Sequence, residues 1–184
     1  MNPHSTPAQQ PDQPTDRPKE RQRDRWRGHP LFARMYARTA PAMERGGVNE
    51  HRRALLAGVS GRVLEVGAGT GANFAHYPPQ VTGVVAVEPE PYLRRLASDA
   101  AAAVPVPVTV TDGRAEHLPA GDHTFDAVVV CLMLCSVPDR EAALAEMFRV
   151  LKPGGQLHVF EHVRAESPRC AGCNGPWTPP SGRC

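Results

Sequence analysis

The chain has 184 residues, of which 41% are hydrophobic, and a formal net charge of +2 at pH 7. This length is enough for one hydrophobic core and short for two, so the sequence predicts one globular domain. The weak charge argues against a nucleic-acid partner, which would favour a strongly basic face. The sequence has no apolar run long enough to cross a membrane and no signal peptide, so we expect a cytoplasmic protein without a membrane partner.

Residues 1–28 are rich in Pro, Gln, Arg and Asp and contain almost no apolar side chains. Such a segment cannot bury enough surface to offset the entropy of ordering, so we expect a disordered tail. After it, apolar residues recur at helical spacing. They predict a first helix that contains Leu31 and Tyr36 and a second helix over residues 41–56. Residues 29–60 are therefore predicted to form a helical segment ahead of the sheet.

Beyond this segment, short apolar runs alternate with amphipathic stretches. The predicted strands cover residues 63–66, 81–87, 106–110, 125–131 and 156–160, and the predicted helices lie just before Pro78 and over residues 91–103 and 140–151. Apolar strands separated by amphipathic helices indicate βαβ crossovers and a parallel sheet that is covered on both faces. The predicted fold class is therefore α/β, with a doubly wound, Rossmann-like and mostly parallel sheet.

The stretch VLEVGAGTG, over residues 63–71, is typical of a buried strand that runs into a glycine turn. In a doubly wound sheet this turn lies at the carboxyl ends of the strands, where nucleotide ligands bind. Its spacing is G-x-G-x-G, whereas a dinucleotide turn needs G-x-G-x-x-G. Glu88 closes the second strand about 20 residues later, where a carboxylate can accept hydrogen bonds from both ribose hydroxyls. The pattern therefore predicts a site for a ribose-containing cofactor.

The series VLEVGAGTG, VVAVEPEP, DGRAEHLP, FDAVVVCLMLCSV and RVLKPGGQLHVFEHV resembles the ordered motifs of class I S-adenosylmethionine-dependent methyltransferases of the type 11 group. The phrases HPLFARMYARTAPAME, GANFAHYPP and LCSVPD are similar to the methyltransferase-like thiol methyltransferases within it. The resemblance covers about residues 29–168 and implies a methyltransferase domain whose residues 29–60 form a lid. It also implies methyl transfer from S-adenosylmethionine to a small-molecule acceptor.

The resemblance implies cofactor contacts at Glu65, Gly67, Ala68, Gly69, Gly71, Glu88, Pro89, Arg114, Ala115 and Leu132. In this assignment the glycines let the backbone approach the cofactor, because they carry no side chain. Glu65 lies near the methionine amino group, and Glu88 binds the ribose. The chain departs from the family at Arg114, since Arg cannot accept a hydrogen bond from the adenine amino group. Asp112 or Glu116 is the alternative acceptor.

The sequence contains no evident catalytic dyad or triad. Glu161 and His162 follow the fifth strand at the cofactor edge, where they could orient an acceptor, act as a base or simply be solvated. Cys131 and Cys135 lie in an apolar run and are interpreted as core or cleft-wall residues rather than nucleophiles. Methyl transfer from a sulfonium needs no protonation of the leaving group, so positioning and water exclusion can suffice.

Residues 169–184 do not continue the expected fold, which would add another helix and two strands, so we expect a chain that lacks the last strands. One hypothesis is a zinc site on Cys170, Cys173, Cys184 and His162. Structural zinc usually takes four well-spaced ligands, commonly from two Cys-x-x-Cys pairs, and this tail has one such pair. We therefore predict no metal site. The preferred interpretation is a shifted reading frame. A one-base shift of a GC-rich back-translation converts the tail into the pattern of an amphipathic helix.

Two other functions stay open at this point. A truncated methyltransferase fold could bind the cofactor without turnover. An NAD-dependent oxidoreductase is the other alternative, but it is opposed by the glycine spacing and by the absence of a Tyr-x-x-x-Lys pair for hydride transfer.

Overall fold

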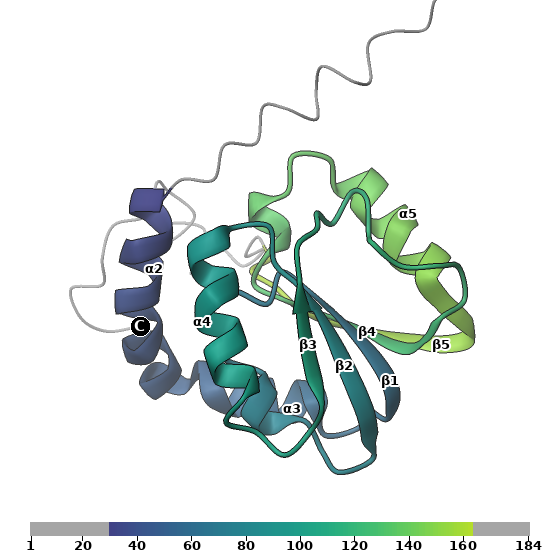
Figure 1. The fold of residues 1–184 in the computed structure, drawn as a ribbon, viewed down its shortest axis with the longest axis horizontal. Coiled ribbons are helices and arrows are strands. Elements are labelled where there is room, and N and C mark those ends of the chain that lie inside the picture. The colour runs from purple at the N-terminus through teal and green to yellow at the C-terminus, as the bar shows by residue number, and fades with distance from the viewer. Residues whose placement is uncertain (1–29, 164–184) are drawn as a thin grey trace, which may run out of the picture.

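A five-stranded sheet in the order β3-β2-β1-β4-β5 forms the centre of the computed structural model, which describes residues 30–163 (Figure 1). The strands are β1 (Gly61–Val66), β2 (Val81–Val87), β3 (Val108–Thr111), β4 (Phe125–Cys131) and β5 (Leu151–Phe160). Every neighbouring pair is parallel. The strand order reverses between β1 and β4, and ligands of doubly wound sheets bind at the carboxyl ends beside such a reversal. The predicted fold class is confirmed.

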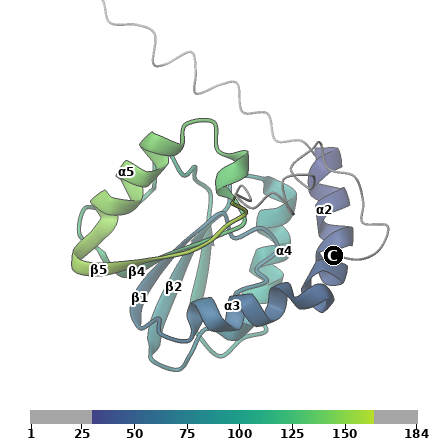
Figure 2. The ribbon, with the colours of Figure 1, turned by 180° about the vertical axis from the view of Figure 1, so that it is seen from behind.

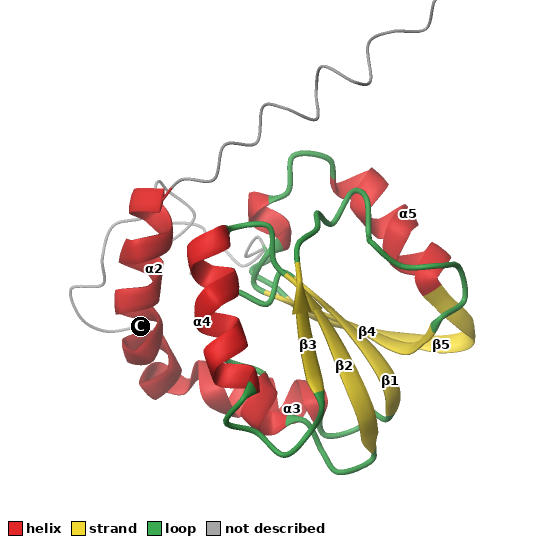
Figure 3. Ribbon diagram, in the orientation of Figure 1, coloured by secondary structure: helices red, strands yellow, loops and turns green. Residues whose placement is uncertain are grey.

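Helices cover both faces of the sheet (Figures 2 and 3). The α-helices are α2 (Pro30–Met43), α3 (Asn49–Leu56), α4 (Pro91–Ala101) and α5 (Arg140–Val150), and the shorter helices are η1 (Glu44–Val48), η2 (Phe74–His76) and η3 (Leu134–Ser136). Leu56 of α3 and Ala97 of α4 belong to one buried apolar cluster, whereas Met147 of α5 belongs to the other. The sheet therefore separates two cores, with α3 and α4 on one face and α5 on the opposite face.

The pleat of the strands decides which side chains meet α3. Val63 packs in the core beneath α3 and α4, and Leu64 packs in the core beneath α5. Because side chains alternate between faces along a strand, Glu65 returns to the face of α3. Cys131, at the end of β4, lies on the same face because Val129 does. Glu65 and Cys131 thus both lie on the α3 face of the sheet, at its carboxyl edge.

Two helices begin at their predicted positions because an acidic side chain caps each one. Glu90 accepts a hydrogen bond from Leu93 N at 2.7 Å ahead of α4, whose first residue is a proline. Asp139 accepts from Ala142 N at 3.0 Å ahead of α5. A capping carboxylate satisfies an amide that the helix leaves unpaired, and proline suits the first helical position.

The largest boundary errors are in the second helix and the fifth strand, while the strands predicted from residues 63 and 106 begin at Gly61 and Val108. The second helix does not start at Pro41, which lies inside α2; the chain departs from helical geometry at Gly47, whose φ is +110°, a value that only glycine adopts readily. The fifth strand starts at Leu151 rather than at residue 156. Phe125 pairs with Leu151, and the next paired residue of β5 is Gln156, so residues 152–155 bulge out of the ladder.

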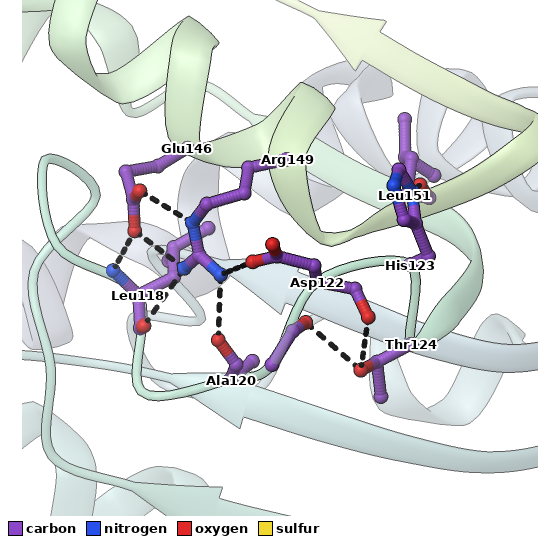
Figure 4. A network of polar contacts seen from close by, with 9 residues as sticks. Leu118, Ala120, Asp122, His123, Thr124, Glu146, Arg149 and Leu151 are labelled. Carbon is purple, nitrogen blue, oxygen red and sulfur yellow. Dashed lines mark hydrogen bonds and ion pairs between the residues drawn. The ribbon is translucent and has the colours of Figure 1, made fainter.

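Arg149, at the end of α5, anchors the loop that leads into β4 (Figure 4). It donates hydrogen bonds to Glu146 at 2.7 Å, to Asp122 at 2.6 Å and to the Ala120 carbonyl at 2.9 Å. The Arg149 guanidinium is the largest influence on Glu146 and holds the pKa of that carboxyl below its usual value. The helix end and the loop are therefore joined by charge-assisted hydrogen bonds.

Replacing Arg149 by Ala is expected to lower the free energy of unfolding by about 1–2 kcal/mol. The effect is modest because the side chain is 31% exposed, and water screens such pairs. Urea unfolding curves of the two proteins measure it. Arg53→Ala, at an exposed position of α3, is the control and should leave the midpoint unchanged. Equal midpoints for both variants would contradict the prediction.

No helix within residues 30–163 is long and apolar enough to cross a membrane. The predicted tails at residues 1–28 and 169–184, and with them the hypothesis of a zinc site on the tail cysteines, lie outside the described residues. Within the described part, no group of three or more His, Cys, Asp or Glu side chains is arranged to hold a metal ion.

Candidate functional site

The glycine turn after β1 is fixed by its backbone. Gly67, Gly69 and Gly71 all have positive φ, at +74°, +57° and +81°. The amides of Gly67 and Ala68 donate to the Val87 carbonyl at 2.9 and 3.1 Å, which ties the turn to the end of β2. A side chain at the first glycine would also collide with Met133, since a Cβ there would lie 2.8 Å from that residue's Cβ. The turn is therefore a backbone surface that only glycine can form.

Glu88 connects the turn to the end of β2. Its side chain is 5% exposed and accepts hydrogen bonds from Gly69 N at 2.8 Å and from Glu90 N at 2.9 Å. Burial raises the pKa of the Glu88 carboxyl, and these two amides oppose the rise. Each carboxylate oxygen keeps a second lone pair after accepting one amide. The carboxylate is thus held rigidly while it retains the capacity to accept further hydrogen bonds.

Arg94 of α4 links one alternative adenine acceptor, Asp112, to the end of β2. Its guanidinium donates to the carbonyls of Glu88 and Pro89 at 2.8 and 3.0 Å, and to Asp112 at 2.9 Å. Asp112 thus lies beside the end of β2, as an alternative acceptor for adenine would require. Arg114 instead pairs with Glu116 at 3.1 Å.

The loop after β4 lies next to the glycine turn, since a Cβ on Gly67 would meet the side chain of Met133. Leu132 has a φ of +55°, which is uncommon for a residue other than glycine, and its amide donates to the Phe160 carbonyl at 2.8 Å. Glu161 accepts hydrogen bonds from Met133 N at 2.7 Å and from Leu134 N at 2.9 Å. Strained backbone of this kind often clusters at functional sites.

The remaining predicted groups divide by burial. Ala68 and Ala115 are buried, and His162 is exposed. Cys131 is buried, as expected of a core or wall residue, and its pKa is raised to about 11, chiefly by burial. Cys135 does not continue the strand; it lies exposed in η3. A thiol that stays protonated at neutral pH is a poor nucleophile, which agrees with the sequence interpretation of Cys131.

Glu65 lies beneath the turn, 2% exposed, and both of its carboxylate oxygens have partners. Asn73 donates to Oε1 at 3.0 Å, and the Tyr77 hydroxyl donates to Oε2 at 2.7 Å. Burial raises the Glu65 pKa to about 7, against the opposing effects of Tyr77, Asn73 and Arg52. Its contact with a cofactor stays a prediction, since its hydrogen bonds within the described residues run to the protein itself.

Sequence analysis missed three side chains that continue from Glu65: Arg52, Asn73 and Tyr77. Arg52 is 5% exposed and donates to Asn73 Oδ1 at 2.8 Å and to Cys131 Sγ at 2.9 Å. One signal for Arg52 was present, because it precedes the apolar Leu56 by four residues and so shares its helix face. The signal for the other two was their place in GANFAHYPP, directly after the glycines.

The helical segment covers the turn. A Cβ built on Gly69 would lie 3.5 Å from Cε1 of Tyr36, so the Tyr36 ring stands against the turn. Burial raises the pKa of the Tyr36 hydroxyl. A groove of about 530 Å³ lies between α2, the residues after the turn and α4, lined by Ala40, Thr70 and Leu96 among others. The segment predicted as a lid is therefore next to the glycine turn.

The chain is similar to several known proteins. The Methyltransf_11 family, described as a methyltransferase domain, matches residues 64–159. The chain is 41% identical over 117 residues to thiol S-methyltransferase TMT1A of Homo sapiens, a match covering 60% of this chain and 47% of the relative. It is 36% identical over 105 residues to the ubiquinone/menaquinone biosynthesis C-methyltransferase UbiE of Haemophilus ducreyi, covering 54% of this chain and 40% of that protein.

A solved structure, that of an S-adenosylmethionine-dependent methyltransferase from Thermotoga maritima, superposes with a TM-score of 0.52 and 30% sequence identity. The superposition covers 67% of this chain and 58% of the other. The chain spans less than half the length of the two curated relatives above.

Proposed function

Because the chain belongs to the methyltransferase domain family, we propose that it binds S-adenosylmethionine at the glycine turn and transfers the methyl group to a small-molecule acceptor. The observation that carries the proposal is the Glu88 carboxylate, fixed between the amides of Gly69 and Glu90 at the carboxyl end of β2. Its remaining lone pairs suit the two hydroxyls of a ribose.

The residues present fit this cofactor. The glycine turn offers backbone without side chains, Glu88 offers acceptors for the ribose, and Leu132, which directly follows β4, would add an apolar side chain. Asp112, which Arg94 holds beside the end of β2, suits the adenine amino group better than Arg114 because a carboxylate can accept that hydrogen bond. We therefore assign the adenine contact to Asp112 rather than to Arg114.

S-adenosylmethionine supplies a methyl group on a sulfonium sulfur. The leaving group of the transfer is a neutral thioether, so no acid is needed to protonate it. The chain then has to orient the acceptor and exclude water. The segment from α2 to α3 suits the second task, because Tyr36 stands against the turn. Glu161 accepts hydrogen bonds from two backbone amides, and this supports a role in shaping the loop after β4 rather than in proton transfer. No dedicated base is needed for a thiol, which is partly ionised near neutral pH.

We propose a thiol as the first acceptor class to test, because the relative with the higher identity of the two is named a thiol S-methyltransferase. A quinone-type carbon acceptor is the second class, after the other relative. A cytoplasmic location stays a prediction from the sequence.

Calorimetric titration of the 184-residue chain with S-adenosylhomocysteine, with NAD as the control ligand, tests the proposal. Saturable binding of the first ligand and none of the second is expected. Folded protein that binds NAD, or neither ligand, would overturn it. Binding without methylation of any thiol or quinone tried would favour a cofactor-binding fold without turnover.

A further inference from the structure

A chain of buried hydrogen bonds runs from beneath the glycine turn into the helical segment. It begins at the Tyr77 hydroxyl, passes through Glu65 to Asn73, and continues from Asn73 Oδ1 to Nη1 of Arg52 at 2.8 Å. Nε of Arg52 then donates to both carboxylate oxygens of Glu44 at 3.1 Å. The side chains of one continuous network thus belong to the first strand, the turn region and the helices before the sheet.

Arg52 is the only member of this network that bonds to three separate parts of the fold. Glu44 belongs to η1, Asn73 follows the glycine turn, and Cys131, whose Sγ accepts from Nη1 at 2.9 Å, ends β4. The guanidinium is suited to this because its planar array of donors reaches several acceptors in fixed directions. A buried cation without such partners would be costly, so the three contacts are needed together.

The position of this junction matters for the site. Glu44 directly follows α2, which carries Tyr36 against Gly69, and the backbone departs from helical geometry at Gly47 between Glu44 and Arg52. The ion pair between Glu44 and Arg52 therefore spans the bend and fixes the angle at which α2 approaches the turn. Loss of the pair would free that angle, because glycine restrains its backbone least.

We propose that Arg52 is a positioning residue for methyl transfer. It holds the lid formed by α2 and η1 in one register on the glycine turn. The inference rests on the proposed function, since the register matters only if the turn binds the cofactor. Arg52 acts through Glu44, Asn73 and Cys131 and need not touch the reacting atoms.

The test compares wild type with Arg52→Met, in which an unbranched apolar side chain fills the space. Arg53→Met is the matched control, since Arg53 is the exposed neighbour on the same helix. Helix α3 should stay docked in both variants through Leu56 and through the contact of the His51 ring with Phe160, at 5.3 Å between centroids. The measurements are calorimetric affinity for S-adenosylhomocysteine and amide hydrogen exchange with and without it.

In wild type and Arg53→Met, we expect the ligand to protect residues 30–48 and the glycine turn together. In Arg52→Met, we expect protection of the turn alone and an affinity lower by roughly tenfold. Arg52→Lys keeps the charge but cannot reach three acceptors at once, so it should also lose the joint protection. This second variant keeps the test valid if Arg52→Met fails to fold.

A pH series supplies a readout that a purely structural role would not move. Arg52 favours the ionised form of Glu65, whose other partners are Tyr77 and Asn73, with the Cys131 thiol nearby. If Glu65 controls a pH midpoint of ligand binding, Arg52→Met should shift that midpoint upward. Arg52→Lys keeps the positive charge and should leave the midpoint unchanged.

Wild type that binds, with unchanged joint protection and affinity in both Arg52 variants, would overturn this inference and leave the proposed function standing. Wild type that fails to bind S-adenosylhomocysteine would overturn the proposed function and this inference with it.

Discussion

Glu88→Ala is expected to weaken binding of S-adenosylhomocysteine by about 100-fold or more. The variant loses the carboxylate that would accept both ribose hydroxyls, and charge-assisted hydrogen bonds of this kind contribute about 1.5–3 kcal/mol each. It also frees the amide of Gly69, which donates to Glu88 at 2.8 Å and helps to fix the turn. Calorimetric titration measures the loss directly.

Two variants separate the ribose contact from a general disturbance. Glu88→Gln keeps the shape and one acceptor oxygen, so an intermediate loss of affinity is expected. Asp99→Ala removes an exposed carboxylate from α4 and should bind like wild type. If Glu88→Ala binds within about threefold of wild type, the carboxylate is not part of the cofactor site, because the loss of one such hydrogen bond already exceeds that ratio.

The sheet was predictable because its strands are nearly continuous apolar runs. The run over residues 125–131 coincides with β4, and the run over residues 81–87 coincides with β2. Helix starts were predictable where a capping carboxylate is present, as at Glu90 and Asp139. Local chemistry decides these features, so they can be read without knowledge of the tertiary fold.

The errors came from residues whose local signal is ambiguous. Pro41 is a helix breaker by propensity, yet α2 continues past it, and the true break lies at Gly47. The bulge over residues 152–155 depends on how β5 pairs with β4, which no local pattern specifies. Pairing with β4 decided the bulge, and the positive φ of Gly47 marks the break after α2.

The candidate site shows the same division. The glycine turn and Glu88 follow from spacing, since both lie at strand ends that a parallel sheet brings to one edge. Arg52 could not be placed from spacing alone, because its partners Asn73 and Cys131 are distant in the sequence. A charged residue in a short helix usually faces solvent, so the shared helix face with Leu56 was a weak signal, and the packed fold shows which groups the buried side chain meets.

The buried carboxyl of Glu65 predicts an unusual dependence of stability on pH. Its pKa is raised from 4.5 to about 7 in the folded chain, first by burial and against the opposing hydrogen bonds from Tyr77 and Asn73. Between pH 4.5 and about pH 7, the Glu65 carboxyl keeps its proton in the folded state and loses it in the unfolded state. The stabilising contribution is therefore complete below about pH 4.5 and is lost as the pH rises through about 7, amounting to roughly 3 kcal/mol.

Urea unfolding of wild type and Glu65→Gln at pH 5, 6, 7 and 8 measures this loss. The difference between the two free energies of unfolding should change with pH, and taking the difference cancels the groups that both proteins share. Asp126 and Glu146 are such groups; their pKa values are lowered, so their contributions are lost as the pH falls instead. Glu141→Gln, at an exposed position of α5, is the control and should show no such trend. A difference between wild type and Glu65→Gln that stays constant with pH would mean that Glu65 is ionised throughout. In that case the nearby Arg52 guanidinium, rather than burial, would determine its charge.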